Sequence, residues 1–302
     1  MAGFSKIEQP GAGVMAARAG IVLVALIWGF KWVSVRFALR DMSPWTFRSI
    51  SFSCAALILI AAAKWRGIGL DVKKGPPRLH LLVAGTLNIG AFGILSAFAQ
   101  LHTTTSRTAI CAYTMPVWAT LLARPILGER LDRWRGGALI IGAAGLIVLL
   151  WPQAATGLSL GTRLALASAL SWAAGTVYLK WANVEASPIA ITAWQLLAGA
   201  VAVTAGLLLS RTRGRLELHW ISVAGLAYTT LIGTALAYLL WFRSAVRLPA
   251  STAGLGILLV PVVGVLASVV LLGDRPDAAE LGGFALIFIA AVCALGPRAN
   301  GQ

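Results

Sequence analysis

The sequence predicts an all-α membrane protein in which ten transmembrane helices form two inverted five-helix repeats around a central cavity. Three observations predict this fold class. The 302 residues are 59% hydrophobic and 12% charged, which leaves too little polar surface for a soluble domain. Apolar runs of about 20 residues, the length that crosses the hydrocarbon core of a bilayer, alternate with short charged clusters. Short motifs recur 144 or 145 residues apart.

Apolar runs between the charged clusters predict five spans in the first half, near 17–38, 44–64, 79–101, 106–127 and 134–152. Five more are predicted near 160–181, 188–209, 218–241, 251–272 and 278–295. The connections are short, so we expect one membrane domain over 1–302, with repeats at about 17–152 and 160–297. Because each half has an odd number of spans, the second half must start on the opposite side of the membrane.

The repeat can be followed along most of the chain. Trp28 corresponds to Trp172, Ser43-Pro44 to Ser187-Pro188, Pro116 to Pro261, and Gly128-Glu129-Arg130 to Gly273-Asp274-Arg275. In the third and eighth spans, Gly85 and Gly93 correspond to Gly225 and Gly233 at an offset of 140 residues. Inverted repeats are a common construction of alternating-access carriers, which bind their substrate near the membrane midplane between the halves.

The basic residues predict the orientation of the chain. More of them fall on the side that both termini share, so the positive-inside rule places both termini in the cytoplasm, although Arg211, Arg213 and Arg215 oppose this bias. The formal net charge of +15 is explained by membrane lipids rather than by nucleic acid. Lys and Arg form short clusters between apolar runs and no continuous basic stripe.

The first span contains a lysine, Lys31, at helical spacing from Trp28. An ammonium group inside a spanning helix is costly and usually faces a cavity or a partner. One interpretation is a cavity cation that meets a substrate carboxylate or an amide carbonyl. The other is snorkelling towards the helix end, because Arg36 lies only about 7.5 Å further along the helix. The sequence leaves both interpretations open.

The third span carries a polar face. Its members recur at intervals of four and therefore align on one side of a helix: Asn88, Phe92, Ser96 and Gln100. This face should point inward, where it either lines a cavity or forms interhelical hydrogen bonds of about 0.6 kcal/mol each. By the repeat offset, Asn88 corresponds to Tyr228 in the eighth span.

Two prolines and a group of glycines predict special packing in the remaining spans. Pro116 and Pro261 occupy corresponding places in the fourth and ninth spans and should bend them, either as gating hinges or as static kinks. Small residues in the fifth and tenth spans predict a close helix–helix contact. These residues are Gly137, Gly142, Gly145, Gly282 and Gly283.

Several kinds of chemistry have no visible apparatus in the chain. The ten carboxylates lie in tails, loops or helix ends and the three histidines lie near helix ends, so we expect transport driven largely by the substrate's own gradient. The three cysteines fall in separate apolar runs without a CxxC pair. Nucleotide-binding and common hydrolase motifs are missing. We therefore expect no enzyme activity, no cofactor and no metal site.

These motifs resemble the EamA branch of the drug/metabolite transporter superfamily. The resemblance rests on LIWG at 26–29, SWAAGTV at 171–177, Pro116 with LGER at 127–130, and Pro261 with LGDR at 272–275. Within that branch, the chain looks most like bacterial exporters of aromatic and neutral amino acids. The resemblance implies a multi-pass inner-membrane exporter with a cavity lined by the first, third, fourth, sixth, eighth and ninth spans.

The resemblance also implies where substrate would bind. Family cavity positions fall on Phe92, Ser96, Tyr113, Met115 and Trp172. Relatives often have an aromatic residue at the Met115 position and can have a tyrosine at Ser96, and these departures imply a roomier, less aromatic pocket. Lys31 is a further departure, because relatives tend to have a small or amide side chain there. We expect Phe92, Tyr113 and Trp172 to hold the substrate side chain, and Lys31, Asn88 and Tyr228 to meet its polar end, with Trp28 on the face of Lys31.

The expected partners are amino acids and membrane lipids, with the chain acting as a monomer or a weak homodimer. Two alternatives stay open at this point. The chain could transport other small metabolites or drugs. It could also be a membrane-embedded enzyme that acts on lipid-linked substrates, which would require carboxylates or histidines that converge near one membrane face.

Overall fold

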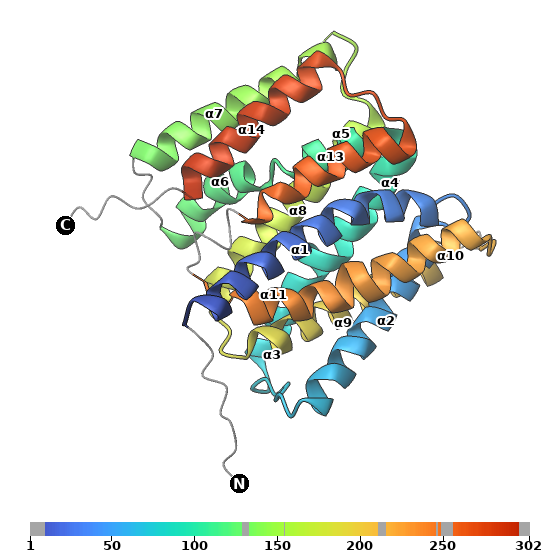
Figure 1. The fold of residues 1–302 in the computed structure, drawn as a ribbon, viewed down its shortest axis with the longest axis vertical. Coiled ribbons are helices and arrows are strands. Elements are labelled where there is room, and N and C mark those ends of the chain that lie inside the picture. The colour runs from blue at the N-terminus through green and yellow to red at the C-terminus, as the bar shows by residue number, and fades with distance from the viewer. Residues whose placement is uncertain are drawn as a thin grey trace.

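The computed structural model describes residues 10–128, 133–153, 155–210, 216–245, 247–248 and 256–295, and these fold into a bundle of helices (Figure 1). Some residues that the predictions used lie outside this part of the chain. They are Glu129 and Arg130 of one repeat motif, Arg211, Arg213 and Arg215, the start of the ninth predicted span and the end of the second repeat.

The helix bounds agree closely with the predicted spans. The first half contains α1 (Pro10–Ala38), α2 (Pro44–Trp65), α3 (Pro76–Gly85), η1 (Thr86–Ala91), α4 (Phe92–His102), α5 (Thr105–Ala112), α6 (Met115–Leu127), α7 (Arg133–Leu150) and η2 (Trp151–Gln153). The second half contains α8 (Leu160–Ala182), α9 (Pro188–Leu209), α10 (Trp220–Ala227), η3 (Tyr228–Leu236), α11 (Ala237–Ala245), α13 (Leu259–Leu272) and α14 (Ala278–Leu295).

Length and hydropathy make this a multi-pass membrane protein. Seven helical stretches of the described chain are long and apolar enough to cross a bilayer: Val14–Ala38, Pro44–Trp65, Pro76–His102, Thr105–Leu127, Gly136–Gln153, Pro188–Leu209 and Trp220–Trp241. Two shorter apolar helices are Leu259–Leu272 and Ala278–Cys293. Large apolar side chains such as Leu208 and Val270, each 77% exposed, point outward, as expected for a lipid-facing surface.

Corresponding local signals begin and end corresponding helices of the two halves. Ser43 and Ser187 are the N-caps of α2 and α9, and their hydroxyl oxygens accept backbone N–H groups at 3.1 and 3.2 Å. Gly128 and Gly273 follow α6 and α13 with φ of 65° and 72°, a left-handed conformation that glycine adopts without steric cost. The repeated motifs therefore mark helix ends.

Contrary to the expectation from the sequence, the third and eighth spans are not continuous α-helices. Each is interrupted by a π-helical segment, η1 in the third and η3 in the eighth. The two segments lie at corresponding places, after Gly85 and Gly225 respectively. A π-helical turn has one more residue than an α-helical turn, and such turns are frequent at functional sites.

The fourth predicted span is also interrupted. A break at Tyr113 and Thr114 separates α5 from α6, two residues before Pro116. In the ninth span, a turn at Leu258 precedes α13 and lies three residues before Pro261. Proline has no N–H for the carbonyl four residues earlier, which weakens the helix at this point. The paired bends predicted from the two prolines are therefore paired breaks.

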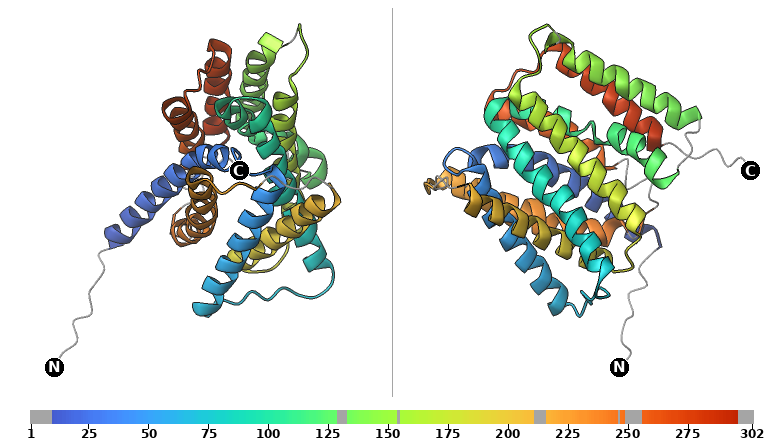
Figure 2. Two further views of the ribbon diagram at one scale, coloured as in Figure 1. Left: turned by 90° about the vertical axis from the view of Figure 1, so that its right-hand side faces the viewer. Right: turned by 180° about the vertical axis from the view of Figure 1, so that it is seen from behind.

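Helices α7 and α14 lie side by side at one end of the bundle, and both views in Figure 2 agree on this. Glycine allows the approach, because a Cβ atom built on Gly145 would lie 2.8 Å from the carbonyl oxygen of Gly283. One built on Gly283 would lie 2.7 Å from that of Gly145. The predicted small-residue contact is thus confirmed for this pair. It is wrong for Gly137, since no described residue lies within 4 Å of its Cβ position.

The remaining helices pack around α1 and α8. Helix α1 contacts α13 on one side and α10, η3 and α11 on the other. Helix α8 contacts α5 and α6 on one side and α3, η1 and α4 on the other. Helices α2 and α9 pack against each other, as α7 and α14 do. This arrangement places η1 against α8 and α9 and η3 against α1 and α2, so that one face of each segment is buried.

The glycine contact gives a test of the packing. We expect Gly145→Ala to lower the midpoint of thermal unfolding in detergent, because the added methyl group forces two helix backbones apart at a cost of about 1–3 kcal/mol. Gly137→Ala on the same helix is the matched control and should leave the midpoint unchanged or raise it slightly, because alanine favours the helix. Equal midpoints for the two variants would contradict the close approach of α7 and α14.

Candidate functional site

The π-helical segment η3 carries three buried threonines that face α1 and α2. The hydroxyl groups of Thr229 and Ser34 of α1 form a hydrogen bond of 2.8 Å, and the Thr230 hydroxyl lies 3.1 Å from the Ser51 hydroxyl of α2. The Thr234 hydroxyl donates to the Thr229 carbonyl, five residues earlier, at 2.8 Å. We call this contact the η3 seam, formed by Lys31, Ser34, Ser51, Thr229, Thr230 and Thr234.

Lys31 belongs to this seam. Its Nζ atom donates a hydrogen bond of 3.0 Å to the Thr234 hydroxyl oxygen. Its aliphatic stem passes over Gly233, where a Cβ atom would lie 3.2 Å from the Cγ and Cδ atoms of Lys31. The ammonium group therefore has a hydrogen-bond partner on the eighth span, and its role as a cavity cation for substrate stays a prediction.

A second buried cation, Arg48, was missed as a site residue by the sequence analysis. Its side chain is 4% exposed, and its Nε atom donates to the Gly93 carbonyl oxygen of α4 at 3.0 Å. The guanidinium carbon lies 4.9 Å from the ring centre of Phe47 and 5.4 Å from that of Phe52. The signal was present, because Arg48 falls inside the predicted span 44–64. It was counted only among the basic residues that set orientation.

Asn88 of η1 forms a second polar contact between helices. Its amide nitrogen donates to Gln195 of α9 at 2.9 Å, and its amide oxygen lies 3.5 Å from the hydroxyl oxygen of Thr176 on α8. Gly175 leaves room for this amide, because a Cβ atom there would lie 2.7 Å from the Asn88 Cγ atom. Asn88 thus makes the interhelical hydrogen bond that the sequence analysis gave as one of two interpretations. We call this contact the η1 seam.

The aromatic site residues lie in separate groups. Trp28 packs against Tyr238 and Trp241 of span eight, with ring centres 5.7 and 5.9 Å apart. Phe92 packs edge-on against Trp32 at 6.5 Å. Trp172 is half-buried on α8, and its carbonyl oxygen accepts the Thr176 hydroxyl.

The other predicted site residues are held mainly by backbone groups. The Tyr228 hydroxyl donates to the Ile27 carbonyl at 3.2 Å, and the Ser96 hydroxyl donates to the Gly93 carbonyl of its own helix at 3.1 Å. Tyr113 ends α5 and Met115 begins α6, and both are half-buried. Over the described ranges, no hydrogen bond or ring contact joins two of the nine predicted substrate-binding residues directly.

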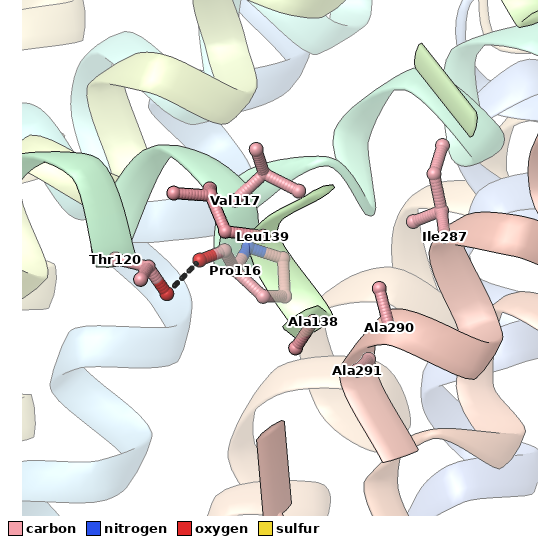
Figure 3. Close-up of a pocket in the computed structure, with 8 residues that line it drawn as sticks. All are labelled: Pro116, Val117, Thr120, Ala138, Leu139, Ile287, Ala290 and Ala291. Carbon is pink, nitrogen blue, oxygen red and sulfur yellow. Dashed lines mark hydrogen bonds between the residues drawn. The ribbon is translucent and has the colours of Figure 1, made fainter. Parts of the chain in front are cut away.

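A small pocket lies between α6, α7 and α14 rather than at the predicted centre (Figure 3). Its empty volume, open solvent included, is about 270 Å³. The Thr120 hydroxyl donates to the Pro116 carbonyl at 2.8 Å at one side of it. The lining residues are Pro116, Val117, Thr120, Ala138, Leu139, Ile287, Ala290 and Ala291. Pro116 is the one predicted residue among them, so this pocket is not the predicted cavity.

Charged contacts join helix ends on one face of the bundle. At the start of α5, the backbone N–H and the hydroxyl of Ser106 both donate to Asp274 at 2.8 Å. Arg107 pairs with Glu280, the first-turn carboxylate of α14, and with Asp277 at 3.4 Å. Glu280 and Asp277 also accept each other's backbone N–H groups, which is a capping box. We call these contacts the α5–α14 clamp. They join the fourth span to the tenth.

A further group on the loop between α1 and α2 was not foreseen from the sequence. Asp41 Oδ2 accepts the Ser222 hydroxyl at 2.5 Å and lies 3.1 Å from His219 Nδ1. Asp41, Glu217 and His219 bring three possible metal-ligand atoms within 4.8 Å of one another. Asp41 is distant in sequence from Glu217 and His219, so no motif spacing could have indicated the group.

Long apolar helices with polar contacts buried between them make this an integral membrane protein. A model of the EamA-like transporter family matches the chain twice, over residues 15–151 and 159–296. The chain therefore belongs to the EamA-like transporter family, as the resemblance indicated.

Known proteins are similar over most of their length. An uncharacterized protein of Pseudomonas aeruginosa is 31% identical over 88% of this chain and 92% of its own. An uncharacterized transporter of Bacillus subtilis, YoaV, is 24% identical over 81% and 84%. A probable amino-acid metabolite efflux pump of Salmonella typhimurium is 24% identical over 88% and 90%. A crystal structure shares the fold with a TM-score of 0.63 and 21% identity, covering 93% of this chain and 96% of that one.

The α5–α14 clamp gives a test with a control in the same chain. Glu280→Gln keeps the capping acceptor but removes the charge that pairs with Arg107, and Glu280 is only 4% exposed. We expect it to destabilise the protein by about 1.5–3 kcal/mol, seen as a lower midpoint of thermal unfolding.

The matched control is Glu185→Gln, which removes a pair with Lys73 whose side chains are both 77% exposed. This pair should contribute about 0–1 kcal/mol, so the midpoint should barely move. A Glu280 variant as stable as the Glu185 variant would show that the clamp does not hold the fourth and tenth spans together.

Proposed function

We propose that this member of the family exports amino acids, aromatic and neutral ones in particular, and related small metabolites across the bacterial inner membrane. The name of the Salmonella relative, a probable amino-acid metabolite efflux pump, supports this substrate class. The chain would work by alternating access without covalent chemistry. It would act as a monomer or a weak homodimer, with both termini in the cytoplasm.

The observation that carries the proposal is an exchange of packing partners between the halves. Helix α1 of the first half packs against spans of the second half, namely α13 (ninth span) and α10, η3 and α11 (eighth span). Its counterpart α8 packs against spans of the first half, namely α5 and α6 (fourth span) and α3, η1 and α4 (third span). α2 pairs with its own counterpart α9, and α7 with α14. A twofold pseudosymmetry produces this exchange, and the double match to the family model supports the duplication. With ten crossings, five in each half, the axis would lie in the membrane plane, as in inverted-repeat carriers.

The two seams occupy equivalent places in this arrangement. The η3 seam joins span eight to α1 and α2, and the η1 seam joins span three to α8 and α9. In the proposal, the substrate binds between them, with Phe92, Tyr113 and Trp172 around its side chain. The breaks before Pro116 and Pro261 would let the fourth and ninth spans bend, so that the site opens to one side at a time.

The α5–α14 clamp fits one state of this cycle. Under the proposed orientation, the clamp lies on the non-cytoplasmic face together with Asp41 and His219. Contacts that close one face while substrate enters from the other are what alternating access requires. Opening that face would break the Ser106–Asp274 and Arg107–Glu280 contacts.

Purified protein in liposomes loaded with single radiolabelled amino acids tests the function. We expect the aromatic and neutral amino acids to move down their own gradients, and an imposed proton gradient alone to drive no accumulation, because the described carboxylates lie outside the seams. Trp172→Ala should slow transport, because it removes a side-chain contact of the substrate. Accumulation driven by a pH gradient alone would refute the proposed energy source, and unchanged transport in the variant would remove Trp172 from the site.

A further inference from the structure

Lys31 and Arg48 bring two positive charges to one buried region. Lys31 reaches η3 from α1 and Arg48 reaches α4 from α2. Ser51, one helical turn after Arg48, bonds to Thr230 of the same π-helical segment that holds Lys31. The two side chains are also linked through neighbouring residues, because Trp32, next to Lys31, packs on Phe92, and Gly93, next to Phe92, accepts the hydrogen bond from Arg48. Like charges repel more strongly in a low-dielectric interior than in water, so this arrangement is unfavourable without an anion.

No carboxylate compensates these charges in the part of the chain that the structure describes. The hydrogen-bond acceptors of Lys31 and Arg48 there are the Thr234 hydroxyl and the Gly93 carbonyl, which are both neutral. The ion pairs shown for described residues join loops and helix ends instead. Ionisable residues inside a membrane usually pair with each other or serve a substrate.

The scaffold does not require the two cations. By the 144-residue offset, Lys31 corresponds to Gly175 and Arg48 to Thr192. The η1 seam joins the three spans that correspond to these by the repeat, but its polar groups are neutral amides and hydroxyls. Asn88, for example, bonds to Gln195 of α9. Ser51 and Gln195 are themselves 144 residues apart, so the two seams share this one position of the repeat. The positive charge is the feature that only the η3 seam has.

We propose that Lys31 and Arg48 form an anion site that binds the carboxylate of a small organic acid with a net negative charge. This inference rests on the proposed export function and selects the negatively charged solutes among its related small metabolites, so neutral amino acids would be the weaker ligands of the same site. The carboxylate would compensate the half-buried Lys31 and the buried Arg48. A zwitterionic amino acid carries an ammonium group beside its carboxylate, which both cations repel, whereas an N-acylated amino acid or a simple organic acid does not.

Aromatic side chains surround this region and suit an organic anion rather than an inorganic one. Phe47 and Phe52 flank the guanidinium group of Arg48, and Phe92 and Trp32 pack on each other between α1 and α4. A substrate with one carboxylate and an apolar body matches the two cations and the aromatic side chains beside them. Binding sites for small molecules commonly combine an apolar lining with a few placed polar groups.

Three solutes that share one side chain and differ in charge test the inference on the wild-type, full-length protein in detergent. They are N-acetyl-L-phenylalanine, L-phenylalanine and L-phenylalaninamide, with net charges near −1, 0 and +1 at neutral pH. Equilibrium binding should be about tenfold or more tighter for the N-acetyl compound than for the other two. Equal affinities, a preference for phenylalanine or its amide, or no binding of any of the three would overturn the proposal.

Variants test whether Lys31 and Arg48 cause the preference for the N-acetyl compound. Lys31→Met and Arg48→Gln should each reduce it at least several-fold, because each removes one charge from the site. Arg48→Lys should keep most of it. Lys64→Met removes an exposed charge from the same helix as Arg48 and should leave it unchanged. A full preference in both Lys31→Met and Arg48→Gln would overturn the assignment. If these variants do not fold, the binding of the three solutes to the wild-type protein still tests the proposal.

The failure of this inference can be told apart from the failure of the proposed function. Counterflow in liposomes measures transport of the same three solutes. Transport of phenylalanine without any preference for the anion would leave the export function standing and remove the anion site. Tight binding of the anion without transport of any solute would keep the anion site and remove the export function.

Discussion

The structure depends on one constraint, which is that polar groups inside a membrane must find their partners within the protein. The three threonines of η3 meet this constraint through α1 and α2, by hydrogen bonds to Lys31, Ser34 and Ser51. These contacts fix how the first two spans sit against the eighth. Likewise, the hydrogen bond between Asn88 and Gln195 fixes the third span against the seventh. Around these seams the bundle is apolar and faces lipid.

Much of the fold could be predicted from the sequence, because helix ends depend on local chemistry. Ser43 and Ser187 cap helices and Gly128 and Gly273 end them, and each of these residues belongs to a repeated motif. The π-helical segments could not be predicted. The six and nine residues of these segments fit an α-helix equally well, and the extra residue per turn is held by partners on other helices.

The candidate site was predicted only in part, because its contacts join residues that are distant in sequence. The position of Lys31 inside a span marked it for attention, but its partner Thr234 lies 203 residues away. Arg48 was not singled out from the sequence, and only the packing of α2 on α4 shows that it is buried. Asn88 was found by its helical spacing, whereas nothing local indicated Gln195. The two seams are alike in backbone and unlike in charge, which makes the site asymmetric although the scaffold is repeated.

The central claim is that the η3 seam lies in the path of a solute that reaches it from both sides of the membrane. Thr230→Cys, in a chain whose Cys54, Cys111 and Cys293 are alanine, tests this most directly. A membrane-impermeant thiol reagent is applied to right-side-out and inside-out vesicles in separate experiments. The account predicts labelling of the cysteine from both sides, slowed by a transported solute. Labelling from one side only, or from neither, would contradict it.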